Sequence, residues 1–231
     1  MRVKVTAKIK AVTPKMEIDR EYMFGYIIGL VLGDGYIKID YKRRHYRIQF
    51  FNTQISVLNR FRHFVKLLGF CPSRLYLRED SRGNQAFEVN FSNKKLALML
   101  NNLKQKPELL KEYLVSENSR LGFLAGLYDS EGSLKHKERR DRPTPQHLAY
   151  ITMTNINLLK VAYSFAKEFG FRVGIYRYNK GRGKYKDEYC LQFNGNKSTF
   201  EFLQLTNPIH PLRIRCSKCG YPDWYKPSWY K

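Results

Sequence analysis

Residues 26–35 read YIIGLVLGDG, and residues 123–132 read FLAGLYDSEG. Each stretch is an apolar run that ends in a small residue, a carboxylate and a glycine, which predicts a buried helix with an acidic C-terminal end. The copies share one offset of 97 residues, so that Asp34 corresponds to Glu131. A buried helix that recurs once predicts two related halves packed on each other.

Small residues occupy one face of each predicted helix at every fourth position. They are Gly25, Gly29 and Gly33 in the first helix, and Gly122, Gly126 and Ser130 in the second. Glycine inside a helix costs about 1 kcal/mol relative to alanine, so two such rows favour a close approach of two backbones. We expect the helices to pack through these faces. A membrane helix pair has similar spacing, but these runs are too short and end in acids.

Such packing would bring two carboxylates together and predicts a metal site. Helix C-termini carry partial negative charge, so Asp34 and Glu131 would repel each other there without a cation. Mg²⁺ prefers carboxylate and carbonyl oxygens. A metal held between two acids can activate water and stabilise the leaving oxygen of a phosphodiester. The alternative is that both acids are polar helix stops, but their shared offset inside a wider repeat favours the metal site.

The elements around each motif also repeat. A hairpin, a helix ending at glycine, a second hairpin and a last helix follow each motif helix. The other predicted helices span residues 56–68, 94–103, 157–169 and 198–205. The predicted strands span residues 36–41, 46–53, 74–78, 87–91, 134–137, 148–154, 173–178 and 188–193. The fold class is therefore α+β, with two pseudo-symmetric αββαββα halves that each contain an antiparallel sheet.

The repeat also sets the predicted domain boundaries. Residues 1–115 form the first half, with an N-terminal extension over 1–18, and residues 116–215 form the second. Residues 2–10 alternate apolar and basic side chains and predict a strand or an extended arm. A polar link over 104–118 joins the halves. The aromatic tail, 216–231, has no counterpart, and we interpret it as a flap packed on the body.

Composition favours a nucleic-acid partner. The chain of 231 residues has a net charge of +22, with 43% hydrophobic and 15% aromatic residues. This apolar content excludes general disorder, and so large a positive charge indicates a polyanionic partner, with a membrane surface as the weaker alternative. No apolar run reaches the roughly 20 residues that span a bilayer. The N-terminus lacks the apolar core of a signal peptide, so we expect a cytoplasmic protein, associated with the nucleoid when bound to DNA.

The four cysteines leave two interpretations open. Only Cys216 and Cys219 have the spacing of metal ligands, and a structural zinc site usually needs a second such pair. They are free thiols or a local disulfide, or they bind zinc together with His210. Cys71 and Cys190 occupy similar places in the two halves, which indicates packing roles.

The predicted strands place basic and polar side chains on one face of each sheet. Cations suit phosphate and guanine, and amides suit adenine, so these faces are candidates for reading a DNA groove. A solvated surface is the alternative for each residue. In the second half, alternation places Ile175 on this outer face together with Arg177 and Asn179. The candidates are Lys38, Asp40, Lys42, Arg43, Arg44, Arg47, Gln49, Arg74, Tyr76 and Arg78, then Lys135, Lys137, Arg139, Tyr150, Thr152, Arg177 and Asn179.

The twin motifs resemble those of the LAGLIDADG homing endonucleases. Residues 124–132, LAGLYDSEG, are close to the family consensus, and residues 27–35, IIGLVLGDG, match it more loosely. The resemblance covers almost the whole chain apart from the tail, and it is to the single-chain type with two motifs. It implies a monomer that acts as a pseudo-dimer. It also implies a saddle of two four-stranded sheets over a long, asymmetric double-stranded DNA target, both strands of which are cut across the minor groove to leave 3′ overhangs.

The resemblance also implies roles for particular residues. Asp34 and Glu131 would bind two or three Mg²⁺ ions, for which Mn²⁺ can substitute, with the carbonyls of Gly33 and Ser130 as supporting ligands. Polar residues that order water fall at Gln54 and Asn155. Basic residues near the site fall at Lys106 and Arg215, with Lys38 and Lys135 as rivals. One departure from the family pattern matters: the sixth motif position is Asp129 in the second copy but Leu32 in the first, so the two halves need not be equal in catalysis.

Two other functions remain alternatives. One is an RNA-splicing maturase that binds host intron RNA, and the other is a DNA-binding protein that has the fold but does not cleave. The presence of both acids favours the endonuclease. The sequence leaves open whether the protein is intron-encoded or free-standing.

Overall fold

The computed structural model describes residues 18–79, 83, 85–138, 145–181 and 186–215. The predicted N-terminal strand or arm, Arg139, the Cys216–Cys219 pair and the aromatic tail lie outside these residues. Within them, no helix is long and apolar enough to cross a membrane.

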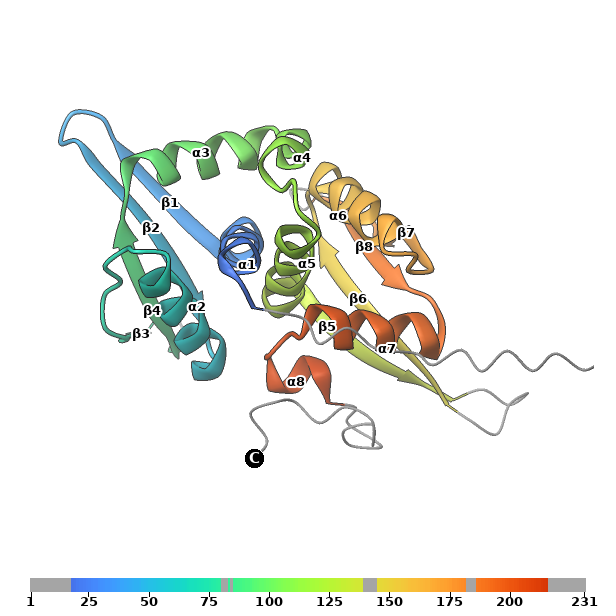
Figure 1. Ribbon diagram of the computed structural model, residues 1–231. Coiled ribbons are helices and arrows are strands. Elements are labelled where there is room, and N and C mark those ends of the chain that lie inside the picture. Colours follow the sequence, from blue (N-terminus) through green and yellow to red (C-terminus); the bar gives the residue numbers. More distant parts are fainter. Residues whose placement is uncertain (1–17, 80–82, 84, 139–144, 182–185, 216–231) are drawn as a thin grey trace, which may run out of the picture.

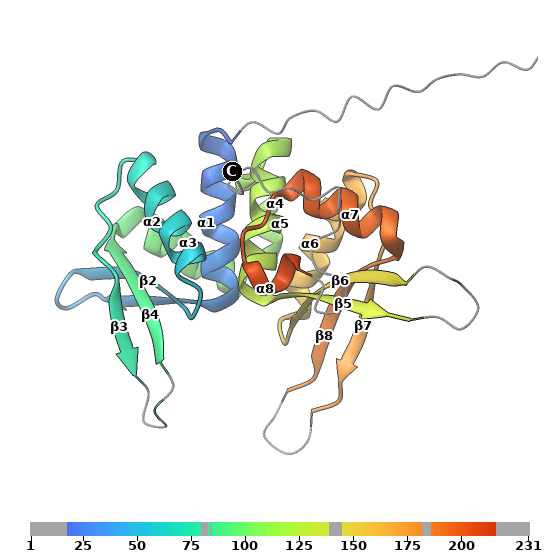
Figure 2. The same ribbon diagram turned by 90° about the horizontal axis from the view of Figure 1, so that it is seen from below.

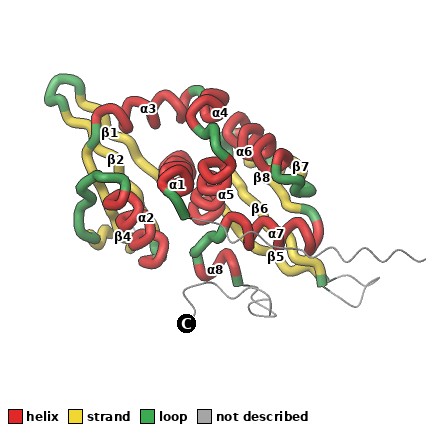
Figure 3. The backbone as a smooth tube through the Cα atoms, viewed as in Figure 1, coloured by secondary structure: helices red, strands yellow, loops and turns green. Residues whose placement is uncertain are grey.

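The described chain runs through the same order of elements twice (Figure 3). The first half consists of α1 (Arg20–Asp34), β1 (Gly35–Asp40), β2 (His45–Asn52), α2 (Ile55–Leu67), β3 (Tyr76–Glu79), β4 (Gln85–Ser92) and α3 (Lys94–Gln105). The second consists of α5 (Glu117–Glu131), β5 (Gly132–Lys137), β6 (Gln146–Met153), α6 (Ile156–Glu168), β7 (Val173–Asn179), β8 (Glu188–Phe193), α7 (Gly195–Thr206) and α8 (Pro211–Ile214). The predicted αββαββα repeat is confirmed.

Local chemistry explains where the motif helices begin. The Asp19 side chain accepts from the Tyr22 amide at 2.8 Å and caps α1. Ser116 accepts from the Ser119 amide at 3.1 Å and caps α5 in the same way. A polar N-cap side chain satisfies a helical N–H that has no carbonyl partner. Both helices are 15 residues long, so the two copies reach their acids in register.

The segment between the halves was predicted to be a polar link, but part of it packs into the hydrophobic core. It forms a short 3₁₀ helix, η1 (Pro107–Leu109), and α4 (Leu110–Tyr113). Leu110 and Leu114 are fully buried in the common core. Two leucines spaced four apart place both side chains on one helical face, so this link is an integral part of the fold.

Each half contributes one four-stranded antiparallel sheet. The strand orders are β1-β2-β4-β3 and β5-β6-β8-β7, which are the same topology. The strands are amphipathic: Ile48 and Phe50 are buried under helices, and Gln49 between them faces the other way. Figure 2 shows the helices on one side of both sheets and the strands splayed apart on the other side, like the two sides of an arch.

The two motif helices lie side by side between the sheets (Figure 1). Their contact is backbone against backbone, because a Cβ on Gly29 would overlap the Phe123 carbonyl oxygen, and one on Gly126 would overlap that of Tyr26. Gly25 and Gly122 are equally restricted by the opposite helix. The glycine faces therefore pack as the sequence predicts.

The register of β7 corrects the predicted face of two residues. Ile175 pairs with the buried Leu191, and Arg177 pairs with Tyr189, which also packs against the core. Both therefore point to the helix side, and Tyr176 points to the open side. A register shift between Arg177 and Asn179 returns Asn179 to the open side, beside Glu188. Simple alternation failed here because the hydrophobic positions of this edge strand are half-exposed and mixed with tyrosine.

Candidate active site

The two motif acids end adjoining helices at the centre of the molecule. Asp34 is the last residue of α1, and Glu131 is the last residue of α5. At Gly33 a Cβ would collide with the Ser130 side chain, so the small residues before each acid permit the helix ends to touch. The sequence prediction that Asp34 and Glu131 share one site is consistent with this geometry.

The electrostatics of the pair disfavour two charged carboxylates. Burial, together with the neighbouring Asp34 carboxylate, raises the pKa of Glu131 to about 7. Asp34 reaches solvent, yet loss of water around its carboxylate raises its pKa as well. An acid whose pKa is raised binds its proton more tightly in the folded state, because the charged form is disfavoured. The site therefore favours a proton or a cation between the carboxylates.

Arg213 is a basic residue at the acids that the sequence analysis missed. Its guanidinium lowers the pKa of both Asp34 and Glu131 against the stronger effect of burial. Its Nη1 donates to the Tyr128 carbonyl at 3.1 Å, and the Tyr128 hydroxyl donates to the Arg213 carbonyl at 2.6 Å. These reciprocal bonds fix α8 beside the end of α5.

Two small cavities lie beside the acids, and each joins residues of both halves. A cavity of about 310 Å³ is lined by Glu131, Thr152 and Asn155 of the second half and by Lys104 of the first. A cavity of about 290 Å³ is lined by Asp34, Asn52 and Thr53 of the first half and by His210 and Arg213 of the second. Each acid is thus accompanied by polar residues at the end of the second strand of its own half and by a basic residue of the other half.

These cavities revise several sequence-based assignments. Asn155 does lie with Glu131, but Gln54 is not among the residues lining the Asp34 cavity, where Asn52 and Thr53 stand instead. The basic residues that line these cavities are Lys104, whose Nζ also donates to the Gly35 carbonyl at 3.3 Å, and Arg213, whereas Lys106 and Arg215 line neither. Lys104 and Arg213 each precede the predicted residue by two positions, and the sequence at a helix end rarely reveals which of two basic residues lies nearer the acids.

Asp129 explains the difference between the two motifs. Its carboxylate is fully buried and accepts from the Tyr26 hydroxyl at 2.7 Å and from the backbone amides of Ile209 and His210 at 3.0 and 2.9 Å. It therefore anchors the segment that carries His210 and Arg213 into the site. Leu32, at the same place in the first copy, is an apolar core residue.

His210 is a second residue that the sequence analysis did not assign to the acids. Burial lowers its pKa to about 4, so its imidazole is neutral near pH 7. Its Nδ1 is buried without a hydrogen-bond partner among the described residues. The sequence signal was weak, because a single histidine followed by proline is compatible with many structural roles.

The side chains proposed for DNA line the open faces of both sheets. The register places Lys38, Asp40, Arg47, Gln49, Tyr76 and Arg78 on the open face of the first sheet. It places Lys135, Lys137, Tyr150 and Thr152 on that of the second. Lys42, Arg43 and Arg44 lie in the exposed turn between β1 and β2, and Arg74 is exposed before β3. Basic side chains thus lie on the open faces of both sheets, on either side of the two acids.

A divalent cation fits the acids only with help from other oxygens. The described residues contain no cluster of three or more histidine, cysteine, aspartate or glutamate side chains that could hold a metal ion. Two carboxylates supplemented by carbonyls, water and phosphate are the ligand set of a hard cation such as Mg²⁺. The repulsion between the two carboxylates is consistent with such an ion.

The fold and the paired acids define a LAGLIDADG architecture, and the family model for the LAGLIDADG-like domain matches residues 21–103 and 118–206. The chain belongs to this family. It is similar to the uncharacterized protein MJ0314 of Methanocaldococcus jannaschii, with 24% identity over 174 residues, which are 74% of this chain. The match spans 64% of that relative's length.

Solved structures show the same fold at low sequence identity. Mesophilic variants of the homing endonuclease I-DmoI match with a TM-score of 0.57 and 18% identity, over 83% of this chain and 98% of theirs. Full-length DUF199/WhiA from Thermatoga maritima matches with a TM-score of 0.57 and 16% identity, over 85% of this chain and 59% of its own. I-DmoI has also been solved in complex with DNA and Mn, with a TM-score of 0.55, 18% identity and coverage of 83% and 98%.

Proposed function

We propose that this protein is a divalent-metal-dependent endonuclease that cuts double-stranded DNA at a specific site. The observation that carries the proposal is the pair Asp34 and Glu131, which glycine packing holds at adjoining helix ends. Loss of water raises the pKa of both acids, and the Asp34 carboxylate raises that of Glu131 further, so this arrangement disfavours two charged carboxylates. Such an arrangement is typical of a functional site.

Mg²⁺ is the proposed cofactor, with Mn²⁺ as a substitute. Asp34 and Glu131 would hold two or three ions together with the carbonyls of Gly33 and Ser130. A bound ion would supply Lewis-acid stabilisation of the phosphodiester and of the attacking water. The I-DmoI complex with DNA and Mn supports this choice by analogy of fold.

Other residues of the two cavities would act on the same phosphodiesters. Asn155 and Thr152 would orient water beside Glu131, and Asn52 and Thr53 would do so beside Asp34. Lys104 and Arg213 would stabilise the charge that develops on the phosphate oxygens. One strand of the duplex would be cut in each cavity.

The substrate would be a long, asymmetric duplex bound by one protein molecule acting as a pseudo-dimer. The net charge of +22 and the basic open faces of both sheets support binding to the phosphate backbone. The two acids lie at the centre, between the sheets, so cleavage would occur near the middle of the target. We infer cleavage across the minor groove with 3′ overhangs, as the family resemblance implies.

A site selection tests this function. The full chain is incubated with a library of randomised duplexes in Ca²⁺, bound duplexes are recovered, and Mg²⁺ or Mn²⁺ is then added. The expected result is a cut at a fixed position in the selected sequence, which EDTA abolishes. Stable, sequence-selective binding with no cut in either metal would contradict the proposed endonuclease.

A second candidate is a DNA-binding protein of the same fold that does not cleave. The position of Arg213 favours it, because a half-buried guanidinium at the two acids offsets part of their charge without a metal. The same selection distinguishes the two functions. Host intron RNA as a partner stays a prediction from the family resemblance.

A further inference from the structure

Glu88 is a buried carboxylate on the open face of the first sheet, where most side chains are exposed to solvent. It lies in β4 with 1% of its surface exposed. The register pairs it with Phe51 of β2 and Tyr76 of β3, on the open side of the first sheet. An acid on a basic DNA-facing surface repels phosphate, so its burial there needs an explanation.

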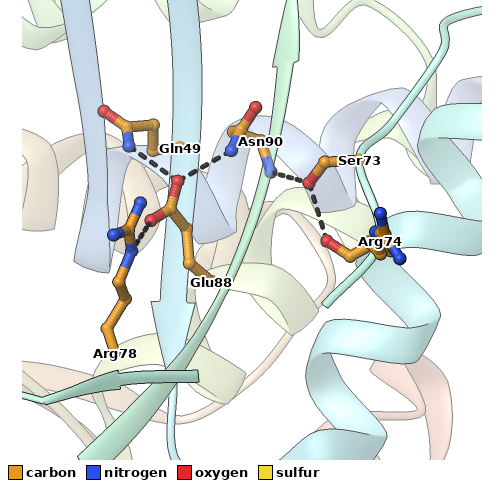
Figure 4. Close-up of polar contacts among 6 residues, drawn as sticks. All are labelled: Gln49, Ser73, Arg74, Arg78, Glu88 and Asn90. Carbon is orange, nitrogen blue, oxygen red and sulfur yellow. Dashed lines mark hydrogen bonds and ion pairs between the residues drawn. The ribbon is translucent and has the colours of Figure 1, made fainter. Parts of the chain in front are cut away.

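Three polar side chains from three adjacent strands surround this carboxylate (Figure 4). Gln49 Nε2 and Asn90 Nδ2 donate to Oε1 at 2.8 and 2.7 Å. Arg78 Nε donates to Oε2 at 2.7 Å. Although burial raises the pKa of Glu88, the hydrogen bonds from Gln49, Arg78 and Asn90 hold it below its ordinary value. The carboxylate is thus ionised and holds its three neighbours in fixed orientations.

The bonds leave defined groups free to meet a ligand. An ionised carboxylate only accepts, so both amides must turn their NH₂ groups to it. Figure 4 shows the amide oxygens of Gln49 and Asn90 directed away from Glu88. Arg78 uses Nε, its side chain is 59% exposed, and its terminal nitrogens keep their donors. An amide oxygen with a second N–H matches adenine, and the guanidinium fork matches guanine.

The second sheet has different side chains at most of the equivalent positions, although Gln192 pairs with Tyr150 as Asn90 pairs with Gln49, and the Gln192 amide donates to Asn194. Its register places Cys190, which is 3% exposed, where the first sheet has Glu88, and Tyr150 where it has Gln49. Lys135 Nζ lies 5.0 Å from the Tyr150 ring centroid and 4.6 Å from that of Tyr178, and it donates to the Tyr178 hydroxyl at 2.9 Å. Lysine and tyrosine hydroxyls suit phosphate and sugar more than base edges.

We propose that Glu88 is a positioning residue that sets base specificity, and that base readout is concentrated in the half of the target bound by the first sheet. The inference rests on the proposed binding of duplex DNA, but not on cleavage. Glu88 itself touches no base. It acts by holding Gln49, Arg78 and Asn90 in place, so that less side-chain freedom is lost on binding.

The hydrogen bond to Glu88 also keeps Arg78 from binding any nearby phosphate. An untethered arginine beside DNA gains affinity from any phosphate, which is independent of sequence. Holding its Nε at Glu88 restricts the guanidinium to one region of the sheet surface. Removing the carboxylate should therefore lower discrimination between bases while leaving total affinity unchanged or raised.

The test is selection from a randomised duplex library in Ca²⁺ with the full chain and three variants. Glu88→Gln keeps the shape and removes the charge. Arg78→Lys, at an exposed side chain that tolerates change, marks the base pairs under the first sheet. Tyr150→Phe is the matched control at the equivalent place in the second sheet. Urea unfolding of each variant shows whether it is folded at the temperature of selection.

The expected result is that Glu88→Gln and Arg78→Lys weaken the preference at the same base pairs, on the order of tenfold. Tyr150→Phe should leave those preferences unchanged. An unchanged profile for Glu88→Gln, a loss spread over both halves, or a loss of affinity with preferences intact would overturn the inference. If the wild-type chain selects no duplex at all, the proposed DNA binding fails, and the inference fails with it.

Discussion

At the residue scale, Glu131 is a motif acid whose ionisation the fold disfavours. Its pKa is about 7 in the folded chain, against 4.5 for an ordinary glutamate. The folded state therefore binds a proton that the unfolded state has lost between these values. It follows that the carboxylate contributes most favourably below pH 4.5 and that stability is lost as the pH rises through 7.

We expect the metal-free protein to be less stable at pH 8 than at pH 5.5, by at most about 2 kcal/mol from this group. Urea unfolding in EDTA at both pH values measures the difference. Glu131→Gln should reduce it, whereas Glu117→Gln, at the far end of the same helix, should leave it unchanged. Equal pH dependence in wild type and Glu131→Gln would show that the fold does not raise the pKa of Glu131.

Asp129 supplies a second prediction at this scale. Asp129→Asn replaces an acceptor by an amide that faces the Ile209 and His210 N–H groups, and should cost about 2–3 kcal/mol of unfolding free energy. Tyr26→Phe removes only the hydroxyl bond to the same carboxylate and should cost about 1 kcal/mol. Chemical denaturation of both variants checks the order. A smaller loss in Asp129→Asn than in Tyr26→Phe would contradict the anchoring role.

At the scale of elements, the glycine contact between α1 and α5 determines the site. Gly126→Ala should cost more than 3 kcal/mol or prevent folding, because the added methyl would overlap the Tyr26 carbonyl of the other helix. Gly69→Ala meets no neighbouring atom but needs a positive φ of 90°, so it should cost about 1–2 kcal/mol. Thermal unfolding of both variants measures the contrast. Similar losses would mean that the helices can separate.

The elements themselves were largely predictable from sequence, and the reasons for the exceptions are physical. Apolar periodicity and stops such as Gly69 located the helices, and the constant offset located the acids. The link was predicted to be polar, since three leucines among charged residues give a weak signal of burial. Ile175 was assigned to the wrong face because an edge strand mixes apolar residues on both sides. Lys104 and Arg213 were missed because only tertiary packing decides which basic residue lies beside the acids.

At the scale of the whole molecule, the two halves share a fold but not a chemistry. One cavity holds Glu131 with Lys104, and the other holds Asp34 with His210 and Arg213. The open faces of the sheets differ in the same way, with a polar cluster around Glu88 and a tyrosine cluster around Lys135. Such asymmetry suits an asymmetric target.

Unequal cavities predict unequal cutting of the two strands. With the selected duplex labelled on each strand, a nicked intermediate should accumulate before full cleavage. Lys104→Met should slow one strand about tenfold or more relative to the other, since it removes a cation from one cavity only. Lys106→Met tests the assignment made from sequence. Simultaneous cutting of both strands, or a strand-specific effect of Lys106→Met in place of Lys104→Met, would refute this division of roles.

The central claim is that Asp34 and Glu131 form one catalytic metal site, and single-turnover cleavage of the selected duplex in Mg²⁺ tests it most directly. Asp34→Asn and Glu131→Gln should each slow cleavage about 1,000-fold or more, while both variants still bind the duplex in Ca²⁺. Glu117→Gln should cleave at the wild-type rate. Cleavage at the wild-type rate by Asp34→Asn or Glu131→Gln would contradict the claim.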